Sequence, residues 1–253
     1  MKIGIITGAS AGLGKEFYRV VCRRHPELDE IWIIARREER LRALAGEMPD
    51  RKTVCVPLDL TLEASYEALE KKLADEKPEI ALLINNAGCG RLGNVKDEHW
   101  TTQTAQVDLN VKAVTAVTTL CLPYMKKGSW ILNVCSISSF CPNPRMTVYS
   151  ATKAYLYSYS KSLRFELQPY GINVCAVCPG PMETEFLGIA GISKDNSKAF
   201  ATLPYCDPVK VTENGVIAAE NGQGVYTPKF FFKFYRAFAK VVPHGIVMHF
   251  SKT

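Results

Sequence analysis

A tyrosine and a lysine four residues apart form the pair with the clearest chemical potential in this sequence. Tyr149 and Lys153 stand at the start of a strongly helical segment, and such positions on a helix hold their Cβ atoms about 5–6 Å apart. At about 5 Å and an effective dielectric constant near 20, Coulomb's law gives about 3 kcal/mol of attraction, or roughly two pK units. The pair therefore predicts a phenol that titrates near neutrality and donates a proton to a carbonyl. Taken alone, the same spacing is also common on ordinary helices.

A glycine-rich turn is the second feature that could do chemistry. The segment Thr7–Gly14 reads TGASAGLG and lies between a β-branched run and the helical run Lys15–Arg24. Glycines let the backbone approach a pyrophosphate, and a helix start offers free N–H groups and the positive end of the helix dipole. We therefore expect a dinucleotide at this turn, bound by Gly8, Ser10, Gly12, Leu13 and Gly14. A plain strand-to-helix turn is the alternative, because the spacing differs from GxGxxG.

Two arginines follow the second predicted strand, about 20 residues beyond the glycines. An NAD enzyme places an acid here for the ribose hydroxyls, whereas an NADP enzyme places an arginine for the 2′-phosphate. The chain has Ala35, Arg36 and Arg37 at this point and no acid. The sequence therefore predicts a preference for NADP(H), with Arg36 and Arg37 as its ligands. The alternative is that Arg36 is a solvated residue at the start of a helix.

Short β-branched runs that alternate with longer helical patterns must position these residues. Runs that are apolar on both faces, separated by helical segments, predict an α/β fold with one doubly wound parallel sheet. Ligands on such a sheet bind beyond the carboxyl ends of the strands. We therefore expect the residues from Thr7, Asn85, Cys135 and Pro179 onward to face one crevice. The runs are Lys2–Thr7, Glu30–Ala35, Thr53–Pro57, Ile80–Asn85, Ser129–Cys135 and Ile172–Cys178.

The combination of these motifs resembles the short-chain dehydrogenase/reductase family in its compact, single-domain Rossmann form. The resemblance covers Lys2 to Tyr226 and predicts one oxidoreductase domain over residues 1–227. The motifs that carry it are TGASAGLG at 7–14, Asp59-Leu60, Asn85-Asn86-Ala87-Gly88, Asn110, Ser136, Tyr149 with Lys153, and Pro179-Gly180-Pro181-Met182-Glu183-Thr184. One departure is Ala11, where many NADP-dependent members carry a basic residue.

The resemblance implies a catalytic set of Asn110, Ser136, Tyr149 and Lys153. In this set Tyr149 is the general acid/base, and Lys153 lowers the pKa of Tyr149 and holds the nicotinamide ribose. Ser136, 13 positions before Tyr149, orients the substrate carbonyl. Asn110 sits at a helix distortion and holds a water that relays protons to Lys153; the alternative is an ordinary polar helix residue.

The resemblance also assigns the remaining contacts to NADP(H). Asp59 with Leu60 would contact the adenine, although Asp59 could instead cap the helix expected from about Leu62. Asn86, Ala87 and Gly88 would form the wall beside the adenine ribose. Thr184 would hold the carboxamide, in a loop that also contributes Pro179, Gly180 and Met182. The resulting reaction is direct hydride transfer between the nicotinamide and a carbonyl carbon, with no metal.

The expected substrate region is predominantly apolar. The resemblance places it near Gly90–Leu92, Ile137–Met146 and a lid over residues 185–206, with Gly90, Arg91, Ile137, Phe140, Met146 and Phe186 as contacts. We expect a hydrophobic ketone or alcohol, with a hydroxysteroid favoured. A 3-oxoacyl thioester on a carrier, or a small ketone or aldehyde, is the alternative. A further alternative is an NADPH-binding sensor with little catalysis, and apolar lid residues can also pack without a ligand.

Composition excludes several other classes. Apolar residues make up 47% and charged residues 22% of 253 residues, which is ordinary for a globular protein. The net charge of +6 includes five cations and no acid over residues 228–253, which leaves +1 for residues 1–227. Residues 1–227 therefore give no reason to expect a nucleic-acid surface. Nine cysteines in a chain of this size indicate reduced thiols. We expect a cytoplasmic protein, because no apolar run approaches the 18 or so residues of a membrane span.

The C-terminal segment, residues 228–253, is basic and aromatic beyond what hydride transfer requires. Its cations Lys229, Lys233, Arg236 and Lys240 recur at helical intervals, and so do Phe231, Phe234, Phe238 and Val241. We expect a helix of about 14 residues, ended by Pro243, which spans about 21 Å. We expect this helix to pack on the same domain, beside the substrate entrance, or on a neighbouring subunit. The alternative is that it lies along an anionic membrane, which it is too short to cross. The family resemblance also implies a homodimer or homotetramer, formed through the helices around Asn110 and Tyr149.

Overall fold

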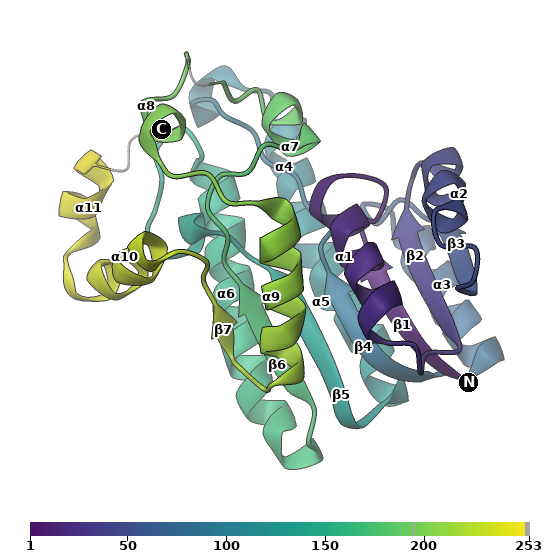
Figure 1. Ribbon diagram of the computed structural model, residues 1–253. Helices are drawn as coiled ribbons and strands as arrows, with labels where there is room; N and C mark the ends of the chain where they lie inside the picture. The colour runs from purple at the N-terminus through teal and green to yellow at the C-terminus, as the bar shows by residue number, and fades with distance from the viewer. Residues whose placement is uncertain (194, 251–253) are drawn as a thin grey trace.

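Seven parallel strands form one sheet at the centre of the computed structural model, which describes residues 1–193 and 195–250 (Figure 1). The strand order is β3-β2-β1-β4-β5-β6-β7, and each neighbouring pair is parallel. This confirms the predicted doubly wound sheet. The strands are β1 (Lys2–Thr7), β2 (Glu30–Ala35), β3 (Thr53–Pro57), β4 (Glu79–Asn85), β5 (Met125–Val134), β6 (Asn173–Val177) and β7 (Val225–Tyr226).

Helices cover both faces of this sheet. Buried residues of α1, α2 and α9 belong to the core on one face, and those of α3, α5 and α6 to the core on the other. Figure 1 shows α1 and α9 in front of the sheet. These helices are α1 (Gly12–Arg24), α2 (Glu38–Gly46), α3 (Glu63–Glu76), α5 (Ala113–Cys121), α6 (Thr147–Leu167) and α9 (Pro208–Glu220). The others are α4 (Trp100–Val107), α7 (Glu185–Ile189), α8 (Lys198–Thr202), α10 (Phe230–Val241) and α11 (His244–Phe250).

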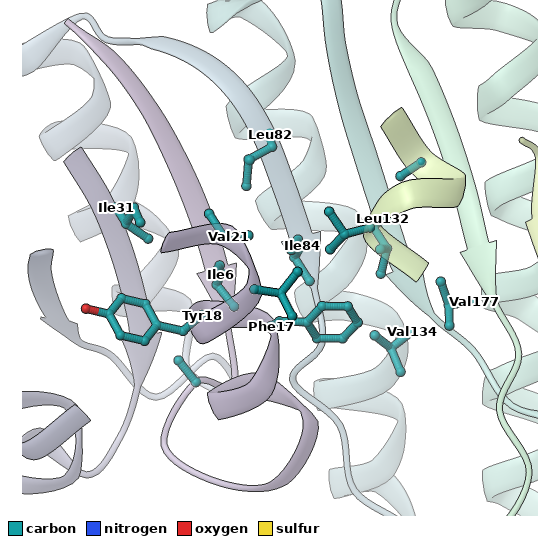
Figure 2. Close-up of a cluster of buried hydrophobic side chains, with 14 of the residues drawn as sticks. Ile6, Phe17, Tyr18, Val21, Ile31, Leu82, Ile84, Leu132, Val134 and Val177 are labelled. Carbon is teal, nitrogen blue, oxygen red and sulfur yellow. The ribbon is translucent and has the colours of Figure 1, made fainter. Parts of the chain in front are cut away.

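The central strands are apolar on both faces because each face meets a different core. Along β1, Ile3 and Ile5 join the core under α3 and α5, whereas Ile6 joins the core under α1. Figure 2 shows the core under α1, in which Phe17 and Tyr18 of α1 lie against the strands. Since side chains alternate between the two faces of a strand, a continuous run of Ile and Leu indicates a strand that is covered on both faces.

The strand boundaries differ from the sequence prediction by one residue at the start of β4 and at each end of β6, and by more at β5. β5 begins at Met125 and not at Ser129, and its pairing with β4 is irregular between Ile80 and Leu82. The added residues include two exposed lysines and Gly128 with a positive φ of 93°, so they carry no apolar alternation. β7 was not predicted, because two residues are too short to form a pattern.

The C-terminal segment forms α10 and then, beyond Pro243, a second helix α11 that was not predicted. Within residues 1–193 and 195–250, no helix has both the length and the apolarity needed to cross a bilayer. The predicted lid spans α7 and α8. Residue 194 of that lid and residues 251–253 of the C-terminal segment lie outside the described residues.

Candidate active site

The turn between β1 and α1 has a backbone that only glycine accommodates easily. Gly8 and Gly12 have φ values of 68° and 51°, in the left-handed region that favours glycine. A Cβ on Gly14 would lie 2.1 Å from the Gly8 carbonyl oxygen, so this position needs glycine for close packing of turn and helix. α1 begins at Gly12 and has no acid in its first turn. The turn therefore presents a positive helix end to an anion, as a dinucleotide pyrophosphate requires.

The residues predicted to wall the adenine ribose also support this turn. The Asn86 amide nitrogen donates to the carbonyl oxygens of Thr7 and Gly8, at 3.0 and 3.1 Å. The Thr7 hydroxyl oxygen accepts from the backbone N–H groups of Asn86 and Ala87, at 3.0 and 3.1 Å. Thr7 was not among the predicted site residues, although it is the first residue of the glycine motif. These four bonds fix the end of β4 to the end of β1.

The two arginines at the end of β2 lie beside the glycine turn. The Arg37 Nη2 atom donates to the Ser10 hydroxyl at 3.1 Å. Arg36 is largely exposed, and its guanidinium lies 3.8 Å from the carboxylate of Asp59. Asp59 accepts hydrogen bonds from the N–H and hydroxyl of Thr61, but Leu62 is the residue that precedes α3. Asp59 is therefore not the helix cap that the sequence left open.

Glu185, at the start of the lid helix α7, is a site residue that sequence reasoning missed. One of its oxygens lies 3.6 Å from Arg37 Nη1, and the other lies 3.0 Å from Arg40 Nη1. The hydrogen bond from Arg40 is the main reason that the pKa of Glu185 is lowered. No local pattern could have revealed this contact, because Glu185 and Arg40 are 145 positions apart in the chain.

Tyr149 and Ser136 meet at the carboxyl end of β5. Tyr149 is buried at the start of α6, and its ring lies 5.6 Å from the ring of Phe186 in the lid. Burial raises the pKa of Tyr149 to about 12, and a hydrogen bond with the Ser136 side chain opposes this rise. The backbone N–H of Ser138 donates to the Ser136 hydroxyl oxygen at 3.1 Å. The serine is thus held toward the phenol.

Lys153 is 4% exposed, and its contacts correct the electrostatic prediction. Its ammonium donates to the Val134 carbonyl oxygen at 2.8 Å and lies 5.9 Å from the centre of the Tyr149 ring. Burial lowers the pKa of Lys153 itself. The expectation that Lys153 brings the pKa of Tyr149 toward neutrality is therefore wrong for this structure. Desolvation of the phenol outweighs the attraction that helix spacing alone suggested.

Asn110 lies in the π-helical turn Asp108–Lys112 between α4 and α5, which confirms the predicted helix distortion. Its fully buried amide accepts from Cys89 N–H at 2.9 Å and donates to the Cys89 carbonyl at 2.8 Å. It also donates to the hydroxyl of Thr152 at 3.0 Å, and that hydroxyl donates to the Tyr149 carbonyl. Asn110 therefore links the loop after β4 to the first two turns of α6.

A cavity of about 320 Å³ joins the glycine turn to the tyrosine. Two of the predicted catalytic and cofactor residues, Gly14 and Asn110, are not among the residues that line this cavity. The other predicted residues line it: Gly8, Ser10, Gly12, Leu13, Arg36, Arg37, Asp59, Leu60, Asn86, Ala87, Gly88, Ser136, Tyr149, Lys153, Pro179, Gly180, Met182 and Thr184. The structure thus brings together at one edge of the sheet residues from seven segments of the chain.

The six predicted substrate residues divide into two groups. Ile137, Met146 and Phe186 line the cavity, together with Leu187, Ile189, Phe200 and Leu203 of the lid region. Gly90, Arg91 and Phe140 do not. Gly90 backs onto the rings of Tyr149 and Phe186, and Arg91 forms an ion pair with Glu98 at 3.1 Å. Phe140 is buried between Tyr157 and Tyr235, with ring centres 5.4 and 6.2 Å away.

Comparison with known proteins identifies the architecture of this site. The family model described as short chain dehydrogenase matches residues 2–191, which contain the glycine turn, Ser136, Tyr149 and Lys153. The chain is a short-chain dehydrogenase. It is therefore an oxidoreductase of the class that acts on CH–OH and C=O groups.

Two curated relatives illustrate the range of this dehydrogenase family. Oxidoreductase UcpA of Salmonella typhimurium is 30% identical over 241 residues, 89% of this chain and 90% of its own. Sulfoacetaldehyde reductase 2 of Chromohalobacter salexigens is 33% identical over 190 residues, 73% of this chain and 74% of its own.

Solved structures share the fold of this dehydrogenase over nearly its whole length. A short-chain dehydrogenase from Sphingobium yanoikuyae in complex with NADPH has a TM-score of 0.78 and 27% identity, covering 96% of this chain and 97% of its own. The 3-ketoacyl-(acyl-carrier-protein) reductase from Brucella melitensis complexed with NADH has a TM-score of 0.76 and 26% identity, covering 90% and 96%. The bulky-bulky ketone specific alcohol dehydrogenase from Comamonas testosteroni has a TM-score of 0.74 and 25% identity, covering 96% and 95%.

Proposed function

We propose that this dehydrogenase uses NADP(H) to interconvert a carbonyl and a secondary alcohol on a hydrophobic substrate. One observation carries the proposal: Ser136, Tyr149 and Lys153 line the same cavity as the glycine turn. When bound, the nicotinamide supplies or accepts the hydride. The residues of the chain then only have to hold the oxygen of the substrate and move its proton.

Each of these side chains has a distinct role in that proton transfer. A phenol with a pKa raised to about 12 is protonated at neutral pH, which is the form that donates a proton to a carbonyl being reduced. The Ser136 hydroxyl, which shares a hydrogen bond with Tyr149, orients the same oxygen. Lys153, held by the Val134 carbonyl, places a cation beside the phenol and stabilises the tyrosinate that forms after donation. Asn110 holds this arrangement through Thr152 and carries the proposed water relay to Lys153.

Arg36 and Arg37 support NADP(H) over NAD(H). Both line the cavity beside Ser10, and β2 ends at Ala35 without an acid for the ribose hydroxyls. The relative from Sphingobium yanoikuyae was solved with NADPH and the one from Brucella melitensis with NADH, so the family alone does not decide the cofactor. The charge of these two arginines is the reason for the proposed preference.

Apolar lid residues support a hydrophobic ketone or alcohol, with a hydroxysteroid-like ketone favoured. Phe186, Leu187, Ile189 and Phe200 line the cavity beside Tyr149. A related dehydrogenase from Comamonas testosteroni is named as specific for bulky-bulky ketones. The acyl-carrier alternative would use Arg91 and the basic C-terminal segment to receive an acidic carrier, and Arg91 lies outside the cavity, paired with Glu98. We therefore keep the 3-oxoacyl thioester and the small ketones and aldehydes as comparison substrates.

A carbonyl panel tests this proposed function. NADPH oxidation is followed at 340 nm with steroid ketones, bulky ketones, oxoacyl thioesters and small aldehydes, and Tyr149→Phe serves as the blank. We expect turnover with hydrophobic ketones that is lost in the variant. Tight NADPH binding with no turnover on any class would instead support a nucleotide-binding sensor.

We also propose that the protein is cytoplasmic and forms a homodimer or homotetramer. Exposed aromatic residues on α6, Tyr155 and Phe165, support contact between copies through this helix. Light scattering during gel filtration gives the subunit number directly. A monomeric mass at all concentrations would exclude the oligomer.

A further inference from the structure

The helix α10 exposes a continuous aromatic surface. Phe230, Phe234 and Val241 are 83%, 60% and 85% exposed, and Phe231 and Phe238 are 51% and 39% exposed. With 3.6 residues per turn, these five residues fall within an arc of about 100° around the helix. We call them the aromatic stripe. Scattered exposed apolar residues are normal on a protein, but a continuous exposed patch marks an interaction surface.

The stripe is not needed to hold α10 on the protein, because another face of the helix does so. Phe232 is fully buried in the core under α1 and α9. It lies so close to Gly180 that a Cβ there would be 2.3 Å from its ring. Ala239 is also buried, and Arg236 donates to the Thr227 hydroxyl at 3.2 Å. Folding therefore explains the buried face of α10, which the stripe touches where the rings of Phe231 and Phe232 lie 5.4 Å apart.

Cations lie along one edge of the stripe. Lys229, Lys233 and Lys240 are exposed, and at 100° per residue they fall on the side of the helix next to Phe230 and Val241. None of the three forms an ion pair with a carboxylate that the structure describes. The sequence has no acid at all from 228 to 253. The partner of this surface must therefore be apolar and must supply negative charge.

We propose that α10 docks this dehydrogenase on the surface of a lipid bilayer that contains anionic phospholipid. The stripe enters the boundary between headgroups and acyl chains, and the lysines contact the lipid phosphates. A second copy of the chain fits less well, because two stripes packed face to face would bring their lysines together without an acid to pair with them. The helix lies along the surface, since its 12 residues span only about 18 Å.

This docking would place the bilayer beside the active site. Phe232 of α10 packs on Gly180, and Gly180 lines the cavity that contains Tyr149. Lipid-dissolved ketones would therefore reach the enzyme at high local concentration. This last step rests on the proposed function, whereas the docking itself is measured without any turnover.

Vesicle flotation with the full chain tests the docking. The probes are vesicles of phosphatidylcholine alone and vesicles of phosphatidylcholine and phosphatidylglycerol in equal parts. We expect the wild type to float with the anionic vesicles only and to be released by high salt. The triple variant Phe230→Ser, Phe234→Ser, Phe238→Ser should bind the anionic vesicles about 100-fold more weakly or worse, because each phenylalanine loses its apolar burial.

Matched variants separate this surface from general hydrophobicity and charge. Lys233→Gln with Lys240→Gln should weaken binding about 30-fold, which corresponds to about 1 kcal/mol for each cation near an anionic surface. The control for the triple variant changes three exposed apolar residues on other elements, Leu62, Tyr170 and Val209, to serine. The control for the charge variant is Lys71→Gln with Lys96→Gln. Both controls should bind as the wild type does, and near-UV circular dichroism verifies that each variant is folded.

Three results would overturn the docking proposal. The first is a wild type that fails to float with anionic vesicles, and the second is a folded triple variant that floats as well as the wild type. The third is a wild type that does not bind vesicles but forms an oligomer that the triple variant does not form, which would make the stripe a contact between copies. NADPH oxidation by the same variants distinguishes these outcomes from failure of the proposed function, because the stripe is not part of the active site.

Discussion

Replacement of Glu185 by glutamine should tighten the binding of NADPH without changing that of NADH. Glu185 forms ion pairs with both Arg37 and Arg40 at the edge of the cavity. An incoming 2′-phosphate needs Arg37, so it must first displace the Glu185 carboxylate from that arginine. The residue therefore lowers the affinity for the phosphorylated cofactor and ties the lid helix α7 to the arginines until that cofactor binds.

The size of the effect follows from the geometry. The two nitrogen-oxygen distances are 3.6 and 3.0 Å, and the side chains involved are 40–49% exposed. Exposed ion pairs contribute about 0.2–1 kcal/mol each, reduced further by solvent and salt. The Arg37 pair is the one that the 2′-phosphate replaces, and at the upper end of this range it contributes about 1 kcal/mol, which corresponds to about fivefold in the dissociation constant of NADPH.

Isothermal titration at low salt measures this change in the absence of substrate. The matched control is Glu38→Gln, which removes one acid from the neighbouring helix α2, where Glu38 pairs with Arg42. We expect Glu185→Gln alone to bind NADPH about fivefold more tightly, and the difference should shrink as salt is added. The reasoning fails if Glu38→Gln has the same effect, or if NADH binding tightens equally.

Three other predictions concern the cofactor ligands and the phenol. Arg36→Asp should reverse the ratio of NADPH to NADH efficiency, and an unchanged ratio in steady-state kinetics would remove Arg36 from the cofactor site. Gly14→Ala should destabilise folding by about 1–3 kcal/mol, because its Cβ meets the Gly8 carbonyl oxygen at 2.1 Å; an unchanged urea midpoint would contradict this packing. In the protein without nucleotide, burial raises the pKa of Tyr149 to about 12, above the unfolded value of about 10. Its contribution to stability is therefore complete below about pH 10 and is lost as the pH rises through about 12; a Tyr149 absorbance change at 295 nm near pH 8, absent from Tyr149→Phe, would refute this.

Features that depend on local pattern could be predicted from the sequence. Strands β1 to β4 are runs of apolar residues, and β-branched runs between helical segments leave few alternatives to a parallel sheet. The glycine turn and the Tyr149–Lys153 pair depend on spacing along one segment. The rule that ligands bind at the carboxyl ends of strands then places these motifs in one crevice.

Contacts between distant segments could not be predicted in the same way. Glu185 reaches Arg40 because the fold brings the first residue of α7 beside the side chain of a residue in α2. Phe140 looked like a substrate contact in an apolar stretch, but α10 covers it through Tyr235. The pKa of Tyr149 depends on how deeply Phe186 and its neighbours bury the ring, and a helix spacing contains no information on burial.

The most direct test of the central claim is a single-turnover comparison of the wild type and Tyr149→Phe with a hydrophobic ketone that the panel identifies. NADPH binding is measured on the same samples by fluorescence. If Tyr149 donates the proton, hydride transfer should fall by about 100-fold or more, while the dissociation constant of NADPH changes little. Hydride transfer at the wild-type rate in a variant that still binds NADPH would contradict the assignment of this cavity as the active site.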